Sequence, residues 1–266
     1  MAEPGLLGGR VTRRLPVRER VIVLSGLTAV AALAWVYLLY MSWGMEHMDA
    51  GASMAIMPRM TDWRVIDLLL VLAMWAIMMA AMMLPSIVPM VLGFASLSRR
   101  RRAQQLPYAP TSLFVLGYLA VWSGFSLFAT LAQWGLLETR LVTPMMASAT
   151  PLLAGALLVI AGVFQFTSLK HACLGKCSSP LGFLLTEWRD GAIGAWIMGF
   201  RHGAYCVGCC GLIMTLLFAF GVMNVLWVAA LSIYILLEKM LPHVRWLPFA
   251  QGVLLICWGI AVAARV

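Results

Sequence analysis

Long apolar runs separated by short polar segments are the feature that most restricts how this chain can fold. Seven runs lie at about 21–41, 66–93, 111–134, 152–169, 203–221, 223–240 and 247–264. A helix needs about 20 mostly apolar residues to cross a bilayer, and most of these runs approach or exceed that length. Because 63% of the residues are hydrophobic and only 11% are charged, a water-soluble domain lacks the polar surface to cover them. The sequence therefore predicts an all-α protein, a polytopic bundle of transmembrane helices with about seven membrane crossings.

The basic residues indicate how such a bundle is oriented. The first cluster precedes the first apolar run and comprises Arg10, Arg13, Arg14, Arg18 and Arg20. A second cluster, 99–102, follows the second run. Clusters of this kind stay on the cytoplasmic side of a membrane. We therefore expect a multi-pass protein of the bacterial inner membrane, with 1–20 as a basic cytoplasmic N-terminal tail and 21–266 as a single transmembrane domain. The position of the basic residues at run ends also argues against nucleic-acid binding, despite a net charge of +9.

Residues 181–200 fit the pattern of apolar runs poorly. An apolar stretch begins near Gly191, but Arg201 and the following histidine interrupt it. We expect an amphipathic or re-entrant segment over 181–200, with the true span beginning near Gly203. A charge within a membrane is usually paired, and the nearby acidic residues Glu187 and Asp190 are the candidate partners of Arg201.

The end of the sixth run carries two adjacent charges, Glu238 and Lys239. Charged residues at the end of a transmembrane helix usually reach the membrane interface. The sequence therefore predicts an interfacial position for both side chains.

Methionines are concentrated in one part of the chain, since twelve of the nineteen lie between positions 41 and 90. One group lies in the polar segment after the first run and comprises Met45, His47 and Met48. A second group recurs every four residues on one face of the second run and comprises Met74, Met78 and Met82. Thioethers select Cu(I) over hard cations, so the pattern predicts capture and relay of a soft metal ion. Packing in an apolar core is the alternative interpretation of the helical group.

Five of the six cysteines fall into two short motifs on the predicted inner side. The first motif contains His171, Cys173 and Cys177. The second contains His202, Cys206, Cys209 and Cys210, which share one face if this segment is helical. Thiolates and imidazoles suit Cu(I), with zinc as the alternative metal. Three other interpretations remain: cysteines as small packing residues, disulfides, which are rare on the cytoplasmic side, and thiol redox chemistry.

Three stretches resemble a bacterial family of predicted metal-binding integral membrane proteins. They are the methionine-rich segment 74–86, the segment 170–189 with the first cysteine motif, and the segment 202–224 with the second. The resemblance implies metal binding in the membrane, without an established reaction. Gly211 follows the paired cysteines where this family often has an aromatic residue, a departure that leaves the candidate ligands intact. The methionines spaced by four are also similar to a pair in the pore helix of eukaryotic high-affinity copper transporters, in chemistry only.

The leading hypothesis is a Cu(I)-binding protein of the inner membrane that acts in copper transport or delivery, from outer thioethers to inner thiolates. Its expected partners are the lipid bilayer and either a metal chaperone or other subunits of a membrane complex. Two alternatives remain, a subunit of a membrane metalloenzyme or oxidoreductase complex and an accessory subunit for assembly. The sequence has no serine–histidine–acid arrangement, phosphate loop or dinucleotide fingerprint. An enzymatic role is therefore disfavoured, and no catalytic residue is assigned.

Overall fold

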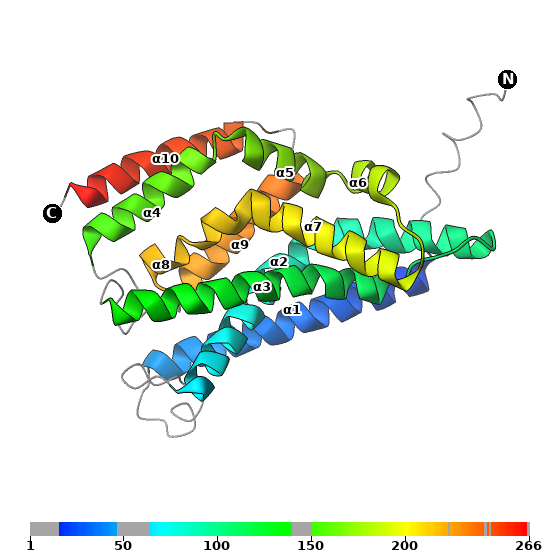
Figure 1. Ribbon diagram of the computed structural model, residues 1–266, viewed down its shortest axis with the longest axis horizontal. Coiled ribbons are helices and arrows are strands. Elements are labelled where there is room, and N and C mark those ends of the chain that lie inside the picture. Colours follow the sequence, from blue (N-terminus) through cyan, green and yellow to red (C-terminus); the bar gives the residue numbers. More distant parts are fainter. Residues whose placement is uncertain are drawn as a thin grey trace.

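The computed structural model describes residues 16–46, 64–139, 150–222, 224–241, 244 and 246–264. Within these ranges the regular secondary structure is entirely helical, which confirms the predicted all-α class. The helices run in the order α1 (Val17–Glu46), α2 (Val65–Ala103), α3 (Thr111–Glu138), α4 (Pro151–Phe164), α5 (Ser168–Ser178), α6 (Pro180–Glu187), α7 (Gly191–Met214), α8 (Leu217–Phe220), α9 (Val225–Met240) and α10 (Trp246–Ala263). Most of the long helices lie roughly along the long axis of one elongated bundle (Figure 1).

Five helical segments in the described part of the chain are long and apolar enough to cross a membrane. They are Val17–Gly44, α2, α3, Gly191–Phe220 and α10. Helices α4 and α5 raise the number to six if they form one span, bent by 67°. All seven apolar runs lie in helices, but α4 and α9 have only 14 and 16 residues. The difference from about seven predicted crossings therefore arises from these two short helices.

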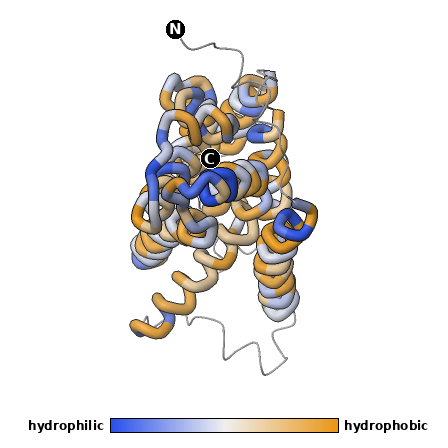
Figure 2. Tube along the Cα trace, turned by 90° about the vertical axis from the view of Figure 1, so that its right-hand side faces the viewer, coloured by the Kyte–Doolittle hydropathy of each residue, from blue (hydrophilic) through white to orange (hydrophobic). Residues whose placement is uncertain are grey.

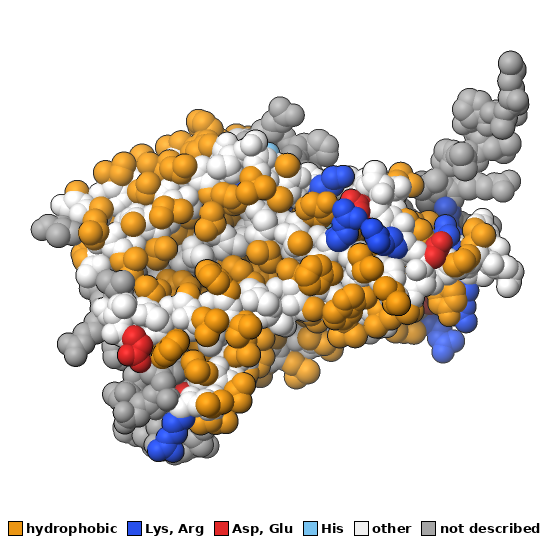
Figure 3. All heavy atoms as spheres, in the orientation of Figure 1, with side chains coloured by type: hydrophobic (Ala, Val, Ile, Leu, Met, Phe, Trp, Pro, Cys, Tyr) orange, Lys and Arg blue, Asp and Glu red, His pale blue; other side chains and the backbone are white. Residues whose placement is uncertain are grey.

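The surface has the apolar covering that lipid contact requires. Hydrophobic side chains cover much of the long face in Figure 3, and most of the Lys and Arg side chains visible there gather toward the right-hand end. Helix α2 ends and α7 begins at that end (Figure 1). Figure 2 looks at the molecule from this end and shows hydrophilic turns in front of largely apolar helices. This separation is compatible with a protein that crosses a membrane along its long axis.

The region 181–200 is divided between α6 and the first turns of α7. Helix α7 runs from Gly191 through Arg201 to Met214 without a break, which corrects the predicted start of the span near Gly203. The physical reason is an ion pair, because Nη1 of Arg201 lies 2.5 Å from Oε2 of Glu187. Because Glu187 compensates the charge of Arg201, helix α7 continues through this position, where the sequence had indicated a break in the apolar stretch.

Ion pairs also connect the ends of three long helices. Nη2 of Arg101, near the end of α2, lies 2.8 Å from Oδ1 of Asp190, immediately before α7. Arg99 forms an ion pair with Glu19 in the first turn of α1. The start of α1, the end of α2 and the start of α7 therefore lie at the same end of the bundle.

Helices α3 and α7 pack along much of their length, and glycines set their separation. A Cβ atom at Gly199 would overlap the carbonyl oxygen of Phe114, and one at Gly117 would overlap the backbone of Trp196. Small residues at such contacts allow two backbones to approach closely within a membrane. The close approach brings Tyr118 of α3 to the cysteine-bearing face of α7.

Candidate metal centre

The second cysteine motif lies on a buried face of α7. His202 is 2% exposed, and Cys206, Cys209 and Cys210 are 0% exposed. Because the segment is helical, spacings of three and four residues place all four side chains on one side of α7, as the sequence predicted. This face is directed into the protein rather than toward lipid.

Helix α5 brings the first cysteine motif against this face, where a loop was expected between two spans. The thiol of Cys177 is buried, and its Sγ atom lies 4.0 Å from Nε2 of His202. We refer to these donors as the thiol–imidazole cluster, which comprises Cys177, His202, Cys206, Cys209 and Cys210.

The other two residues of the first motif lie outside the cluster. Cys173 is half-buried and packs on α7 where Gly208 leaves room, since a Cβ atom there would come within 2.7 Å of its sulfur. His171 is exposed on the outer side of α5. Of the three candidate ligands in this motif, the structure therefore brings only Cys177 directly to the second motif.

The sulfur of Cys206 has the richest set of polar contacts in the cluster. Nζ of Lys239, at the end of α9, donates to it at 2.9 Å, and the hydroxyl of Tyr118 lies 3.1 Å away. The same ammonium donates to Oγ of Ser86 in α2 at 3.0 Å. Helices α3, α7 and α9 thus meet at one sulfur atom, and α2 joins them through the lysine ammonium. An ammonium donor favours the thiolate, which is the form that binds metals.

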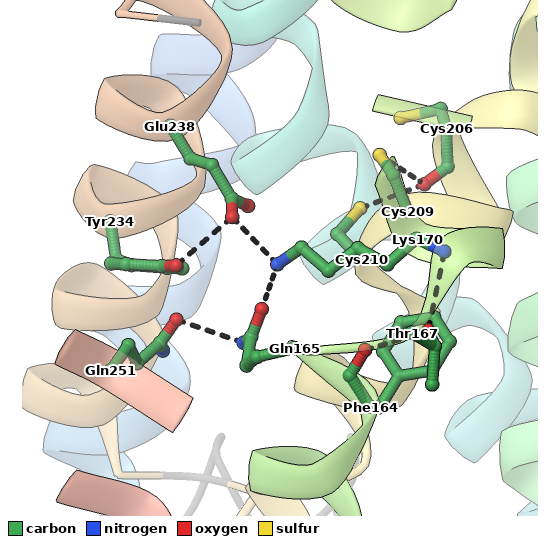
Figure 4. A network of polar contacts seen from close by, with 10 residues as sticks. All are labelled: Phe164, Gln165, Thr167, Lys170, Cys206, Cys209, Cys210, Tyr234, Glu238 and Gln251. Carbon is green, nitrogen blue, oxygen red and sulfur yellow. Dashed lines mark hydrogen bonds and ion pairs between the residues drawn. The ribbon is translucent and has the colours of Figure 1, made fainter. Parts of the chain in front are cut away.

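Cys209 and Cys210 direct their thiols back to their own helix. Both thiols donate to the carbonyl oxygen of Cys206, at 3.1 and 2.9 Å (Figure 4). All six cysteines are free. Among the described residues, no group of three or more His, Cys, Asp or Glu side chains has the arrangement of a ready metal site. Coordination by three or more of these groups therefore requires the thiols of Cys209 and Cys210, or the ring of His202, to rotate.

The imidazole of His202 has an unsatisfied nitrogen. Its Nδ1 atom is buried and has no hydrogen-bond partner among the described residues. The ring is enclosed by the aromatic rings of Phe114, Tyr118 and Phe183, with centroid distances of 6.0, 6.0 and 5.1 Å. Buried polar atoms are nearly always hydrogen-bonded, so Nδ1 carries a lone pair or proton without its usual partner, while the other ring nitrogen, Nε2, is the one that faces the thiol of Cys177.

A second polar network lies beside the cluster and corrects the predicted interfacial position of Glu238 and Lys239. These side chains are only 2% and 7% exposed. Oε1 of Glu238 lies 2.6 Å from Nζ of Lys170, which also donates to Gln165 (Figure 4). The hydroxyl of Tyr234 donates to the same carboxylate oxygen at 3.1 Å. Partners from α5 and α9 allow the charge of Glu238 to be buried where the sequence suggested contact with water, and partners from α2 and α7 do the same for Lys239.

A cavity of about 500 Å³ lies next to this network. Its walls include Gln165, His171, Ser178 and Glu238, together with apolar side chains of α10. Ser178 follows Cys177 on α5, and Glu238 precedes Lys239 on α9. The cavity therefore adjoins the helices that carry Cys177 and Lys239, and the imidazole of His171 lies in its wall.

The predicted methionine face of α2 is buried, since the exposed fractions of Met74, Met78 and Met82 are 2%, 1% and 1%. This face approaches the cluster, because Ser86 lies one turn beyond Met82 and accepts the hydrogen bond of Lys239. The other predicted methionine group lies outside the described residues, which exclude His47, Met48 and the side chain of Met45. Burial agrees with a relay and equally with core packing, so the geometry alone does not choose between them.

Comparison with known proteins places these features in a family context. Residues 72–262 match the model of a family described as PpoB2, copper chaperone. The matched range contains the methionine face, both cysteine motifs and Lys239, and it begins after α1. No match was found among curated proteins or among solved structures.

Proposed function

The chain belongs to the PpoB2 family, whose description is copper chaperone, and on that premise we propose that it binds Cu(I) inside the bacterial inner membrane and delivers it. Copper is the cargo in this proposal, and the thiol–imidazole cluster is its binding site. The supporting observation is the convergence of α5 and α7. Their thiols and the orphaned imidazole of His202 share one buried place.

The proposed ligands are the thiolates of Cys177 and Cys206, together with the imidazole of His202. Soft sulfur donors with an imidazole favour Cu(I) over magnesium, calcium or manganese. Cys209 and Cys210 lie one turn from Cys206 and provide alternative thiols after rotation, which suits a site that must accept copper and release it. His171 then lies in the wall of the cavity, where copper leaves toward a partner, and Cys173 lies against Gly208 of α7 as a further thiol.

Copper is proposed to reach the cluster from the outer side of the membrane. Met45, His47 and Met48 capture Cu(I), and the buried methionine face of α2 passes it toward Ser86 and Cys206. Affinity for Cu(I) rises from thioether to thiolate, which gives the movement an inward direction. The chain then acts as a membrane-embedded carrier that hands copper to a chaperone or to another subunit, and no catalytic step is required.

Titration of the purified full-length protein with Cu(I) in detergent tests the site. We expect Cys206→Ser and Cys177→Ser each to weaken Cu(I) binding by at least about tenfold, because each removes a ligand. Cys257→Ser is the matched control, since Cys257 is an exposed thiol on α10, far from either motif in the sequence. Equal Cu(I) affinity in the wild type and both cluster variants would contradict the proposed site.

A further inference from the structure

Two lysines are buried in this protein, and their positive charges are compensated in different ways. The ammonium group of Lys170 forms an ion pair with the carboxylate of Glu238. Among the described residues, no carboxylate pairs with Lys239, whose ammonium donates to Oγ of Ser86 and to Sγ of Cys206. A buried cation without compensation is strongly unfavourable, so the balancing charge has to come from sulfur.

The donor set of the cluster does not by itself distinguish Cu(I) from Zn(II). Cysteine thiolates and imidazoles are also the usual ligands of zinc. The thiol–imidazole cluster therefore needs a further feature if it is to reject the divalent ion. The two metals differ in charge, and a fixed charge next to the ligands responds to that difference directly.

We propose that the buried ammonium of Lys239 makes the thiol–imidazole cluster selective for a monovalent soft cation, an inference that rests on the proposed function. Two thiolates carry a charge of −2, Lys239 contributes +1, and Cu(I) contributes +1, so the loaded site is neutral. With Zn(II) in the same site the sum is +1. That excess charge would be buried in a low-dielectric interior, where it is costly.

The other groups around the site leave this sum unchanged, because the thiols of Cys209 and Cys210 keep their protons as donors to the carbonyl oxygen of Cys206. Tyr118 and Ser86 contribute neutral hydroxyl groups. The Lys170–Glu238 pair, which lies beside Lys239, has no net charge. Lys239 is thus the single uncompensated charge that the described residues place at the sulfur of Cys206, and it acts on the metal as a specificity residue rather than as a ligand.

The selectivity ratio is the direct test. Competition with chromophoric chelators at fixed pH gives the dissociation constants of Cu(I) and Zn(II) for the full-length protein in detergent. We expect Lys239→Met to reduce the preference for Cu(I) over Zn(II) by at least about tenfold, because the divalent ion is relieved of twice the repulsion. Lys239→Arg keeps the charge and retains the ratio. Lys176→Met, which removes an exposed lysine of α5, is the charge-matched control.

A measurement on the wild type keeps the inference falsifiable even if Lys239→Met fails to fold. Ag(I) and Cd(II) are both soft cations, but they differ in charge in the same way as Cu(I) and Zn(II). We expect Ag(I) to displace Cu(I) and Cd(II) to leave it bound. Equal ratios in Lys239→Met and the wild type, or efficient displacement by Cd(II), would overturn the selectivity while leaving copper binding intact. Failure of the wild type to bind Cu(I) would overturn the proposed function itself.

Discussion

The pair formed by Lys170 and Glu238 shows what a single buried charge requires in this protein. Both side chains are almost fully inaccessible, at 0% and 2%. Gln165 accepts a further hydrogen bond from the ammonium and Tyr234 donates one to the carboxylate, so neutral polar groups extend the pair on both sides. The removal of one member leaves the other charge buried without compensation.

Lys170→Met is therefore expected to destabilise the protein by about 3–5 kcal/mol, the usual cost of breaking a buried ion pair. The double variant Lys170→Met with Glu238→Gln removes both charges and should recover most of that loss. Unfolding in mixed micelles, followed by circular dichroism, measures both free energies. If the single variant is as stable as the wild type, or the double variant is no more stable than the single variant, the ion pair does not compensate two buried charges.

The sequence allowed the sulfur ligands to be identified but not their surroundings. Spacing on one helix gives the shared face of His202, Cys206 and Cys209, because periodicity is a local property. Lys239 and Tyr118 belong to other helices, and nothing local connects them to Cys206. The available indication was a lysine directly beside a glutamate at the end of an apolar run, a pattern that more often marks the interface.

At the scale of helices, the contact between α3 and α7 positions Tyr118 against the sulfur of Cys206 in the cluster. The glycines at 117 and 199 allow the two backbones to touch, and Tyr118 follows the first of them. A side chain at either position separates the helices. The hydroxyl of Tyr118 then moves away from the sulfur of Cys206.

Gly199→Ala should accordingly lower stability by about 1–3 kcal/mol, the range for overpacking, and weaken Cu(I) binding. Gly124→Ala on α3 is the control, because a Cβ atom there meets nothing within 4 Å. Exchange of glycine for alanine at such an open helical site is neutral or stabilising by up to about 1 kcal/mol. Thermal unfolding and copper titration of the two variants give the comparison, and indistinguishable behaviour would show that the close contact is unnecessary.

The apolar runs predicted the existence of the helices better than their limits. All seven runs are helical, since their length and composition decide this locally. The prediction placed the start of one span near Gly203 instead of Gly191, because Arg201 suggested an interruption. Its partner Glu187 lies in a separate helix, so the compensation depends on tertiary structure that a local pattern does not contain.

For the whole molecule, the arrangement of sulfur residues suggests a direction. The methionine face of α2 lies on the side of Ser86 away from the basic end of that helix. The thiol–imidazole cluster lies beyond Ser86, where α5, α7 and α9 meet. A cation that follows this order moves from weak to strong donors and toward the predicted cytoplasmic side.

Cu(I) uptake into proteoliposomes tests this direction. We expect the double variant Met78→Leu and Met82→Leu to take up Cu(I) at least about tenfold more slowly, since leucine conserves packing but removes the sulfur. Its equilibrium binding of Cu(I) in detergent should be unchanged. Met240→Leu, at an exposed position of α9, serves as the control. Unaltered Cu(I) uptake by the double variant would exclude the methionine relay. If the wild type takes up no Cu(I), transport is excluded, and the protein would deliver copper from a fixed binding site.

The ion pair between α5 and α9 also has a consequence for biogenesis. Lys170 emerges from the ribosome 68 residues ahead of Glu238, the group that neutralises it. Until synthesis reaches that point, its ammonium has to remain in contact with water. The 67° bend between α4 and α5 permits this, because α5 can rest at the headgroups while α4 is already inserted. Docking of α5, and with it the arrival of Cys177 beside His202, therefore becomes a late event that waits for the ninth helix.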